Sequence, residues 1–249
     1  MNKFIPEDQT NELGLTVGFP VDNWNGAESP GRSVLLGEYC RCEPLNLDKH
    51  SPDLFSAFEQ DNENRAWVYL PYGPFDSLIE YQHWMKNACF NGDPFYYAIV
   101  DNKTDSSIGV VSYLRINPKA GSIEVGHINY SPALQRTVAA TEAMYLMMHN
   151  AFKLGYRRYE WKCNVLNEKS CNAAKRLGFS YEGTFRQMLV VKGQNRDTAW
   201  FSILDREWPA VEHVFLNWLS PENFDATGTQ IKALSTLTCD ALKSINTQS

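Results

Sequence analysis

Apolar and polar residues follow two different periods along this chain, and the changes of period mark its elements. Residues 108–116 (IGVVSYLRI) and 122–130 (SIEVGHINY) follow the strand pattern, and residues 95–100 (FYYAIV) form an apolar run. Short polar turns separate the three segments, at residues 101–106 and 117–121. Strands joined by such turns predict an antiparallel meander.

After the meander the period becomes that of a helix. From Val138 to Leu154 apolar residues recur every three or four positions, and Gly155 stands where a helix ends. A strand over residues 156–165 is expected next, and then a helix with Asn167 as its N-cap and Gly178 as its terminator. The other expected elements are a first strand at 34–42, helices within 47–60 and 76–90, a closing hairpin with strands at 182–191 and 198–204 around a turn at 192–197, an amphipathic helix from Pro209, and a loosely packed Thr/Ser-rich tail.

This order predicts one mixed α/β domain. We expect the domain to span residues 33–208, preceded by a polar arm over residues 1–32 that lies on its surface. Residues 209–249 are expected to add a helix and a tail. The length of 249 residues gives ample chain for a core of this size.

Composition excludes several classes of partner. The net charge of −6 and the pI near 5.4 argue against nucleic-acid binding, which needs a basic face. No apolar run approaches ~18 residues, so we expect no membrane-spanning helix and no membrane partner. The six cysteines form no CxxC pair, which signals neither zinc nor a disulfide framework. A reduced cytoplasmic protein is expected, in which Cys163 and Cys171 are either thiol nucleophiles or inert buried thiols.

The segment SPALQRTVAATEA, residues 131–143, stands between the third meander strand and the long helix. A helix N-terminus offers unpaired N–H groups and a partial positive charge, which suit a phosphate. The tip of this segment nevertheless carries no glycine. It is therefore either a modified phosphate site or an ordinary helix start.

Two motifs in this order resemble the GNAT superfamily of acyl-CoA N-acyltransferases, most closely its RimJ/RimL-type branch. They are Q-x-x-x-x-A-T-E-A from Gln135 and N-E-K-S-x-x-A-A-K-R-L-G-F from Asn167, and the resemblance covers roughly residues 34–206. It implies a central, mostly antiparallel twisted sheet with a splayed parallel pair of strands and flanking helices. It also implies an N-acetyltransferase that takes its acetyl group from acetyl-CoA.

The resemblance assigns the coenzyme site. Backbone amides of a Q/R-x-x-G-x-G/A loop hold the pyrophosphate in that family, and Val138 stands where the first glycine belongs. Valine can still donate its N–H from a helical conformation, and Arg136 can add charge. A cradle with a changed tip, a relic that binds poorly and a bare helix start all remain open. The loop residues are Gln135, Arg136, Thr137, Val138, Ala139 and Ala140.

The pantetheine arm would lie between the strands at 122–130 and 156–165. It would hydrogen-bond the exposed backbone of the first strand as an added strand does. Gly126 is consistent with a bulge or a close approach there. The residues implied are Val125, Gly126, His127 and Ile128 on the strand, with Asn167 and Ser170 at the second helix.

Acyl transfer needs an acid for the leaving thiolate and a base for the amine. The tyrosine that many family members use is replaced by Ala174, so the resemblance implies Ser170 as the acid, unless its hydroxyl bonds the Asn167 backbone. Glu124 and His127 are the candidate bases. An ion-pair partner and a core histidine are the alternatives for these two residues.

The acceptor is expected to be a small-molecule amine or a peptide N-terminus. Aromatic residues that could line its pocket are Trp67, Tyr69, Tyr72, Phe75, Trp84, Phe185 and Trp200, although such residues usually belong to a core. Their number favours a bulky or apolar acceptor. A catalytically silent GNAT-fold binding or assembly module is the rival interpretation, and the acyl chain length and a homodimer are left open.

Overall fold

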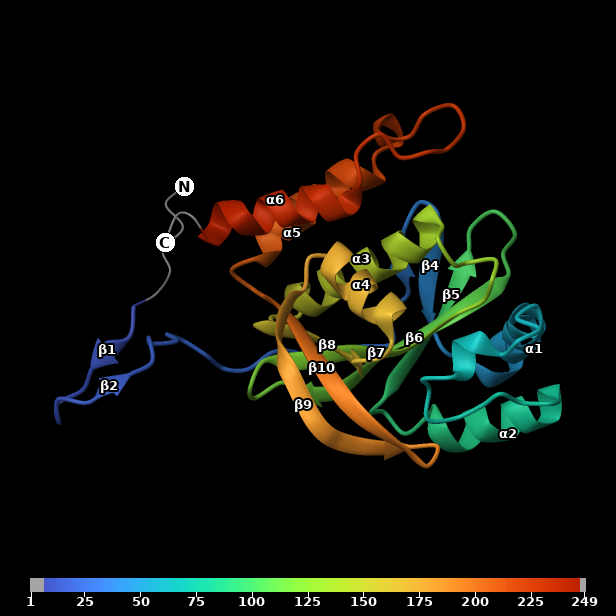
Figure 1. The fold of residues 1–249 in the computed structure, drawn as a ribbon, viewed down its shortest axis with the longest axis horizontal. Helices are drawn as coiled ribbons and strands as arrows, with labels where there is room; N and C mark the ends of the chain where they lie inside the picture. Colours follow the sequence, from blue (N-terminus) through green and yellow to red (C-terminus); the bar gives the residue numbers. More distant parts are fainter. Residues whose placement is uncertain (1–6, 247–249) are drawn as a thin grey trace.

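The structure is a computed structural model that describes residues 7–246, and its main feature is one eight-stranded sheet. The strand order is β3-β4-β5-β6-β7-β8-β10-β9 (Figure 1). These strands are β3 (Leu35–Leu36), β4 (Cys40–Pro44), β5 (Phe95–Asp101), β6 (Ser107–Asn117), β7 (Ser122–Tyr130), β8 (Arg158–Asn164), β9 (Ser180–Val191) and β10 (Gln194–Leu204). The helices are α1 (Leu47–Glu59), α2 (Leu78–Ala88), α3 (Val138–Lys153), α4 (Glu168–Arg176), α5 (Trp208–Leu219) and α6 (Leu234–Asn246), with 3₁₀ turns η1 (Arg65–Trp67) and η2 (Pro221–Asn223).

Every neighbouring pair in this sheet is antiparallel except β7 and β8, which run parallel. Their pairing ends at Val125 and Trp161, although β7 continues to Tyr130 and β8 to Asn164. The two strands therefore separate beyond this point. The predicted mixed α/β fold, with a mostly antiparallel sheet and one splayed parallel pair, is confirmed.

Helices cover the two faces of the sheet unequally. Figure 1 shows α3 and α4 on one side with α5 and α6 beyond them, whereas α1 and α2 lie near β5 and β6 on the other. Alternate residues of β5 divide between two cores: Tyr97 and Ile99 face the α3 side, and Tyr96 and Ala98 face α1 and α2. This alternation follows from the two-residue period of a strand. The α1 and α2 face is left without a helix over β7, β8 and β10.

The strand predicted over residues 34–42 is wrong in one respect, because it is a hairpin of β3 and β4. The buried Glu142 carboxylate of α3 accepts the N–H groups of Glu38, Tyr39 and Cys40 at 2.7–2.8 Å. A Cβ atom on Gly37 would lie 2.5 Å from this carboxylate. The turn therefore forms around a side chain from a helix about a hundred residues away. A contact over that distance cannot be predicted from the local sequence pattern.

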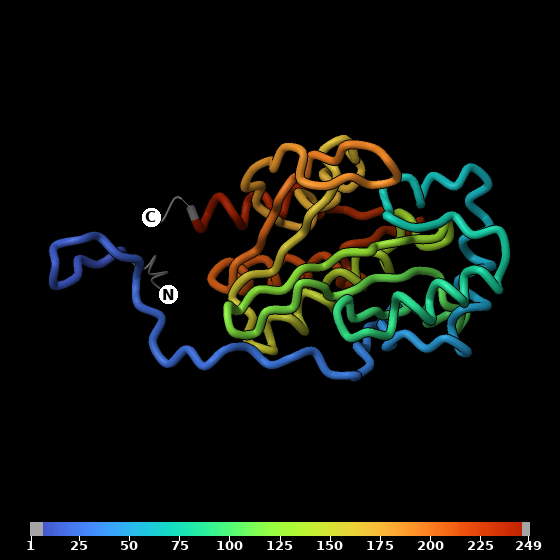
Figure 2. Tube along the Cα trace, turned by 90° about the horizontal axis from the view of Figure 1, so that it is seen from below, coloured from blue at the N-terminus to red at the C-terminus, as the bar shows by residue number. Residues whose placement is uncertain are grey.

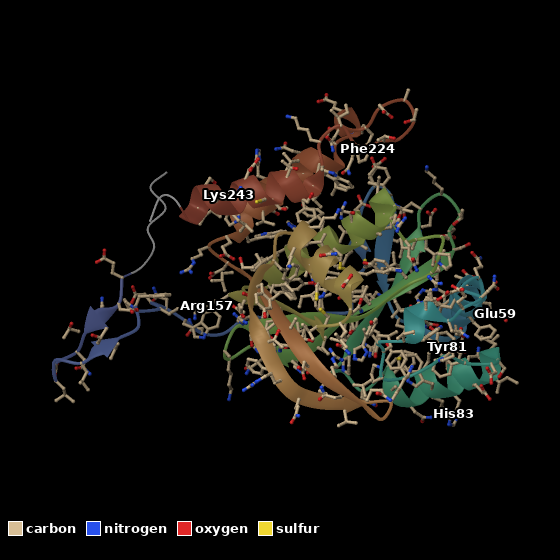
Figure 3. The ribbon with its side chains drawn as sticks, in the orientation of Figure 1. Glu59, Tyr81, His83, Arg157, Phe224 and Lys243 are labelled. Carbon is tan, nitrogen blue, oxygen red and sulfur yellow. The ribbon has the colours of Figure 1, made fainter. Side chains whose placement is uncertain are left out.

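The ends of the chain also differ from the expectation. Residues 234–246 form α6 rather than a loose tail: Leu234 is buried, and the buried Thr238 donates its hydroxyl to the Arg176 carbonyl at 3.1 Å. The arm lies on the surface from Trp24, whose indole N–H donates to the Lys119 carbonyl at 2.8 Å and whose ring centroid lies 5.5 Å from the guanidinium carbon of Arg157. Figure 3 labels Arg157 where the arm meets the domain. Its first part, with strands β1 (Gln9–Thr10) and β2 (Thr16–Val17), is exposed and stands away from the domain (Figure 2). Across residues 7–246 there is no helix of the length and apolar character needed to cross a membrane.

Candidate active site

The opening between β7 and β8 has a bulge on its β7 side. Ser112 of β6 pairs with Gly126 and Val110 pairs with Asn129, so β7 carries an extra residue between them. His127 takes up this irregularity with φ = 50°, a value uncommon outside glycine. Gly126 meets a close approach instead, because a Cβ there would lie 2.8 Å from Leu114 Cδ2. Both features that Gly126 suggested are therefore present, on adjacent residues.

The loop before α3 places two free backbone donors at the helix start. Thr137 is the N-cap, and its hydroxyl accepts the Ala140 N–H at 3.1 Å. The N–H groups of Val138 and Ala139 have no acceptor among the described residues. Val138 adopts the helical conformation that donation of its N–H requires, as the first residue of α3. An anion at this helix start would therefore meet these two N–H groups and the positive end of the helix.

The remaining loop residues hold the backbone or face solvent. The Gln135 side chain donates to the Tyr130 carbonyl at 2.9 Å, which ties the loop to the end of β7. Arg136 is exposed and adopts φ = 62°. The left-handed conformation in this loop, which a glycine would adopt without strain, is taken by Arg136, two residues before Val138.

The start of α4 places Ser170 against β8. Asn167 caps the helix, with its side chain accepting the Ser170 N–H at 3.1 Å. The Ser170 hydroxyl accepts the Trp161 indole N–H at 3.0 Å and also hydrogen-bonds the Cys163 thiol, rather than the Asn167 backbone. Burial raises the pKa of Cys163 to about 12, so this thiol stays protonated and is a weak acceptor. Cys171 lies with its sulfur 3.5 Å from that of Cys163.

Glu124 lies buried on β7 between two cations. Its carboxylate oxygens are 2.8 Å from Arg115 Nη1, and one is 2.9 Å from Lys162 Nζ. Lys162 is 8% exposed and also contacts Glu160 at 2.7 Å. Burial raises the pKa of Glu124, and Arg115 and Lys162 oppose this rise. Glu124 is therefore an ion-pair partner in this structure, which was the alternative to its role as the base.

His127 lies among tyrosines, on the edge of the core beneath α1 and α2. Its Nδ1 is 3.1 Å from the Tyr72 hydroxyl, and its ring stacks on Tyr72 with centroids 5.5 Å apart. Its Nε2 has no hydrogen-bond partner among the described residues. Burial, with the nearby Arg115 and Arg196 guanidinium groups, lowers the pKa of His127 to about 4. The imidazole is therefore neutral at pH 7.

Most of the aromatic residues proposed as a pocket lining form this second core instead. Trp67, Tyr72, Phe75 and Trp84 pack together with Tyr81, and all of these except Phe75 line a cavity of only ≈ 10 Å³. Tyr69 donates its hydroxyl to the Leu166 carbonyl at 3.1 Å, so the α1–α2 loop reaches the loop before α4. Phe185 and Trp200 stack on the closing hairpin, with centroids 4.5 Å apart.

Arg196 is the residue that sequence reasoning missed. The expected turn over residues 192–197 is wrong, because the chain reverses at Lys192 and Gly193 and β10 already begins at Gln194. Arg196, Thr198 and Trp200 therefore alternate along one strand, with Trp200 paired to Lys162. The alternation itself is visible in the sequence, but the polar run QNRD hid the start of the strand.

The comparison with known proteins decides the family. The domain family described as Acetyltransferase (GNAT) domain matches residues 43–180. The chain belongs to this GNAT family. It is accordingly an acyltransferase, and the resemblance drawn from its two motifs is confirmed.

Solved and curated relatives agree with this assignment. A GCN5-related N-acetyltransferase from Brucella melitensis is 43% identical, covers 88% of this chain and 100% of its own, and superimposes with a TM-score of 0.86. Over 87 residues, 34% of this chain and 48% of the relative, the chain is 34% identical to the ribosomal-protein-serine acetyltransferase of Escherichia coli (strain K12). RimL, a ribosomal L7/L12 alpha-N-protein acetyltransferase in complex with coenzyme A, shares the fold at 19% identity, with 69% of this chain and 98% of its own covered and a TM-score of 0.57.

One GNAT position is closed to catalysis here. Ala174, where many members carry a tyrosine, is fully buried in the core on the α3 side of the sheet. It cannot supply a hydroxyl. Within residues 7–246 no group of His, Cys, Asp and Glu side chains is arranged to hold a metal ion.

Proposed function

We propose that this GNAT protein transfers the acetyl group of acetyl-CoA directly to a primary amine. The observation that carries the proposal is the pair of free N–H groups at Val138 and Ala139, at the mouth of the splayed strands. Two donors at a helix start suit a pyrophosphate, and unpaired β7 backbone suits an extended pantetheine arm. The RimL structure of the same fold contains coenzyme A, which supports this assignment.

For the acceptor we propose a small-molecule amine or a peptide N-terminus. The Escherichia coli relative is a ribosomal-protein-serine acetyltransferase, and RimL is an alpha-N-protein acetyltransferase. The first name supports a protein substrate, and the second supports a peptide N-terminus. The six cysteines are all free, which supports a reducing compartment such as the cytoplasm.

The proposed acid is Ser170. Its Oγ is held by the Trp161 indole, and its proton faces the Cys163 thiol, a weak acceptor. A thiolate that forms nearby is a much stronger acceptor and would draw this proton. The hydrogen bond from the Trp161 indole N–H positions the Ser170 hydroxyl oxygen, and the hydroxyl proton remains available for transfer.

The proposed base is His127 rather than Glu124. Both Glu124 oxygens already contact cations, whereas His127 Nε2 is unpartnered in the described part of the chain. The Tyr72 hydroxyl also hydrogen-bonds Tyr96, and it has one proton to give. If that proton goes to Tyr96, His127 donates from Nδ1 and keeps a lone pair on Nε2. The positive charges of Arg115 and Arg196 would also lower the pKa of an acceptor ammonium group nearby, so that a weak base can remove its proton more easily.

A thermal-shift titration tests the proposal. Acetyl-CoA should raise the melting temperature, because a ligand at a hundredfold excess over its Kd stabilises the native state by ~2.7 kcal/mol. Adenosine should have a much smaller effect, since it lacks the pyrophosphate and the pantetheine arm. No shift at millimolar acetyl-CoA would instead favour the silent GNAT-fold module.

A further inference from the structure

Three buried hydrogen-bond donors lie in a row on β10. Arg196, Thr198 and Trp200 alternate along the strand, so their side chains lie on one face of the sheet, the face that also carries Lys162 and Glu124. This is the face left without a helix over β7, β8 and β10. The row therefore borders the opening between the splayed strands on the side away from α3 and α4.

All three side chains have a buried polar atom without a partner. These atoms are Arg196 Nε, Thr198 Oγ1 and Trp200 Nε1, and none has a hydrogen bond within residues 7–246. A buried donor left unpaired costs about 1–3 kcal/mol, and more when the group is charged. Buried polar atoms in folded proteins are generally hydrogen-bonded, so three unpaired ones on the same face of one strand indicate a ligand that would pair with them.

The acids near Arg196 are already committed. Glu124 contacts Arg115 and Lys162, and the neighbouring Asp197 accepts the Gln187 N–H and the Asn195 side chain at 2.8 and 2.9 Å. No salt bridge to Arg196 exists in the described chain. The Arg196 guanidinium nevertheless interacts electrostatically with His127, Cys163 and Glu124. Arg196 therefore lies near the proposed transfer site.

The chemistry of the row selects a singly charged anion. It offers one uncompensated guanidinium and two neutral groups, and Lys162, whose Nζ lies 3.8 Å from the centre of the Trp200 ring, is already neutralised by Glu124 and Glu160. A guanidinium fork matches the two oxygens of a carboxylate. A phosphate dianion would need a second free cation.

We propose that the acceptor amine carries a carboxylate, and that Arg196 binds it with help from Thr198 and Trp200. The inference rests on the proposed function and names the class of its acceptor: a free amino acid or a short peptide with a carboxylate close to its N-terminus. Phe185, which stacks on Trp200 of the row, favours an apolar side chain on that acceptor.

The test compares each acid with its uncharged amide, and KM is expressed per neutral amine because amidation lowers the pKa of the α-amine. Initial rates are measured with acetyl-CoA and two matched pairs, phenylalanine against phenylalaninamide and Gly-Phe against Gly-Phe-amide. A preference for phenylalanine would place the carboxylate on the carbon that carries the amine, and a preference for Gly-Phe would place it one residue further along. The wild-type chain should show a KM about tenfold to hundredfold lower for one acid than for its amide, the range expected for hydrogen bonds to a charged group.

Arg196→Gln should remove this preference, so that the KM values for each acid and its amide become similar, whatever the change in overall rate. Arg206→Gln makes the same change of charge at an exposed residue beyond the far end of β10, and it should keep the preference. Arg196→Lys should restore part of it. Trp200→Phe, which keeps the stacking on Phe185 but removes the N–H, should weaken acid binding several-fold. Loss of activity in Arg196→Gln equally with acids and amides, with the preference kept, would overturn the proposal.

Calorimetric binding to the coenzyme A-saturated chain separates the two proposals. Phenylalanine or Gly-Phe should bind the wild type and not Arg196→Gln, whether or not turnover is fast. If acetyl-CoA stabilises the chain and neither acid binds better than its amide, the carboxylate inference fails while the coenzyme assignment stands. If acetyl-CoA itself gives no shift, the proposed function fails, and the carboxylate inference falls with it.

Discussion

The proposed coenzyme side and the proposed acceptor side of the splayed strands are built in different ways. On the coenzyme side, the N-caps Thr137 and Asn167 lie within three residues of the groups they bond, and the helix starts present their free donors locally. On the acceptor side, Glu124, Arg115 and Lys162 come from three strands, and Arg196 comes from a fourth. The first side is a set of local motifs, and the second is an assembly of distant residues.

This difference explains why the sequence predicts the first side better than the second. Cap residues and helix starts leave a pattern over a few positions, whereas a charged network exists only once the sheet has formed. It also separates two kinds of constraint. The coenzyme side presents backbone groups that most substitutions spare, and the acceptor side depends on individual side chains.

The largest expected effect is at His127, on the acceptor side. Its pKa is about 4 in the folded chain and near 6.5 when unfolded, so the neutral ring stabilises the fold above pH 6.5. That contribution, roughly 3 kcal/mol, should be lost as the pH falls from 6.5 to 4. In His127→Asn, where asparagine tolerates the positive φ, the loss over this range should be smaller by that amount.

Urea unfolding of the two proteins at pH 7, 5.5 and 4 measures this difference. An identical pH dependence in both would show that the surroundings of His127 do not lower its pKa, which contradicts this prediction. His83→Asn offers a matched control, because that histidine is exposed on α2.

A somewhat smaller effect is expected for Ser170 on the coenzyme side. Ser170→Ala should lower kcat by about a hundredfold, the low end for a general acid, because a thiolate leaves well unaided. Coenzyme affinity should change little, since the Asn167 cap bonds the backbone of residue 170 and survives the substitution. Steady-state rates with calorimetric coenzyme binding distinguish the two quantities. A loss of affinity with an unchanged kcat would make Ser170 a binding residue and sharpen the contrast with the acceptor side.

The smallest effect is expected at Val138. Val138→Gly should leave coenzyme affinity equal or slightly tighter, because the N–H that binds is retained and the side chain is removed. The free energy of unfolding should fall by up to ~1 kcal/mol, since glycine is a poor helix residue. Coenzyme binding by calorimetry and chemical unfolding measure the two effects. A collapse of binding would mean that the valine side chain itself shapes the site, contrary to a backbone-based coenzyme side.

The sequence predicted most of the fold because the hydrophobic periods are strong in β5 to β8, α3 and α4. It failed where a distant side chain decides a local conformation, as Glu142 does for the turn between β3 and β4. It also failed at Arg196, because a polar run looks like a turn until a neighbouring strand pairs with it. The contacts of Glu124 and His127 were beyond sequence reasoning, since Lys162 and Tyr72 lie far from them in the chain.

The Glu142 carboxylate bears on how such sequences are compared. It belongs to the A-T-E-A string that marks the first GNAT motif, yet it joins α3 to the turn at residues 38–40 and contacts no candidate site residue. A Cβ atom at position 37 would also lie 2.8 Å from the Cys40 carbonyl oxygen, so glycine is expected to be kept there together with the glutamate during divergence. A descendant that had lost its chemistry would still need this pair to fold. Retention of the glutamate therefore records shared ancestry of the scaffold, and activity has to be judged from other positions.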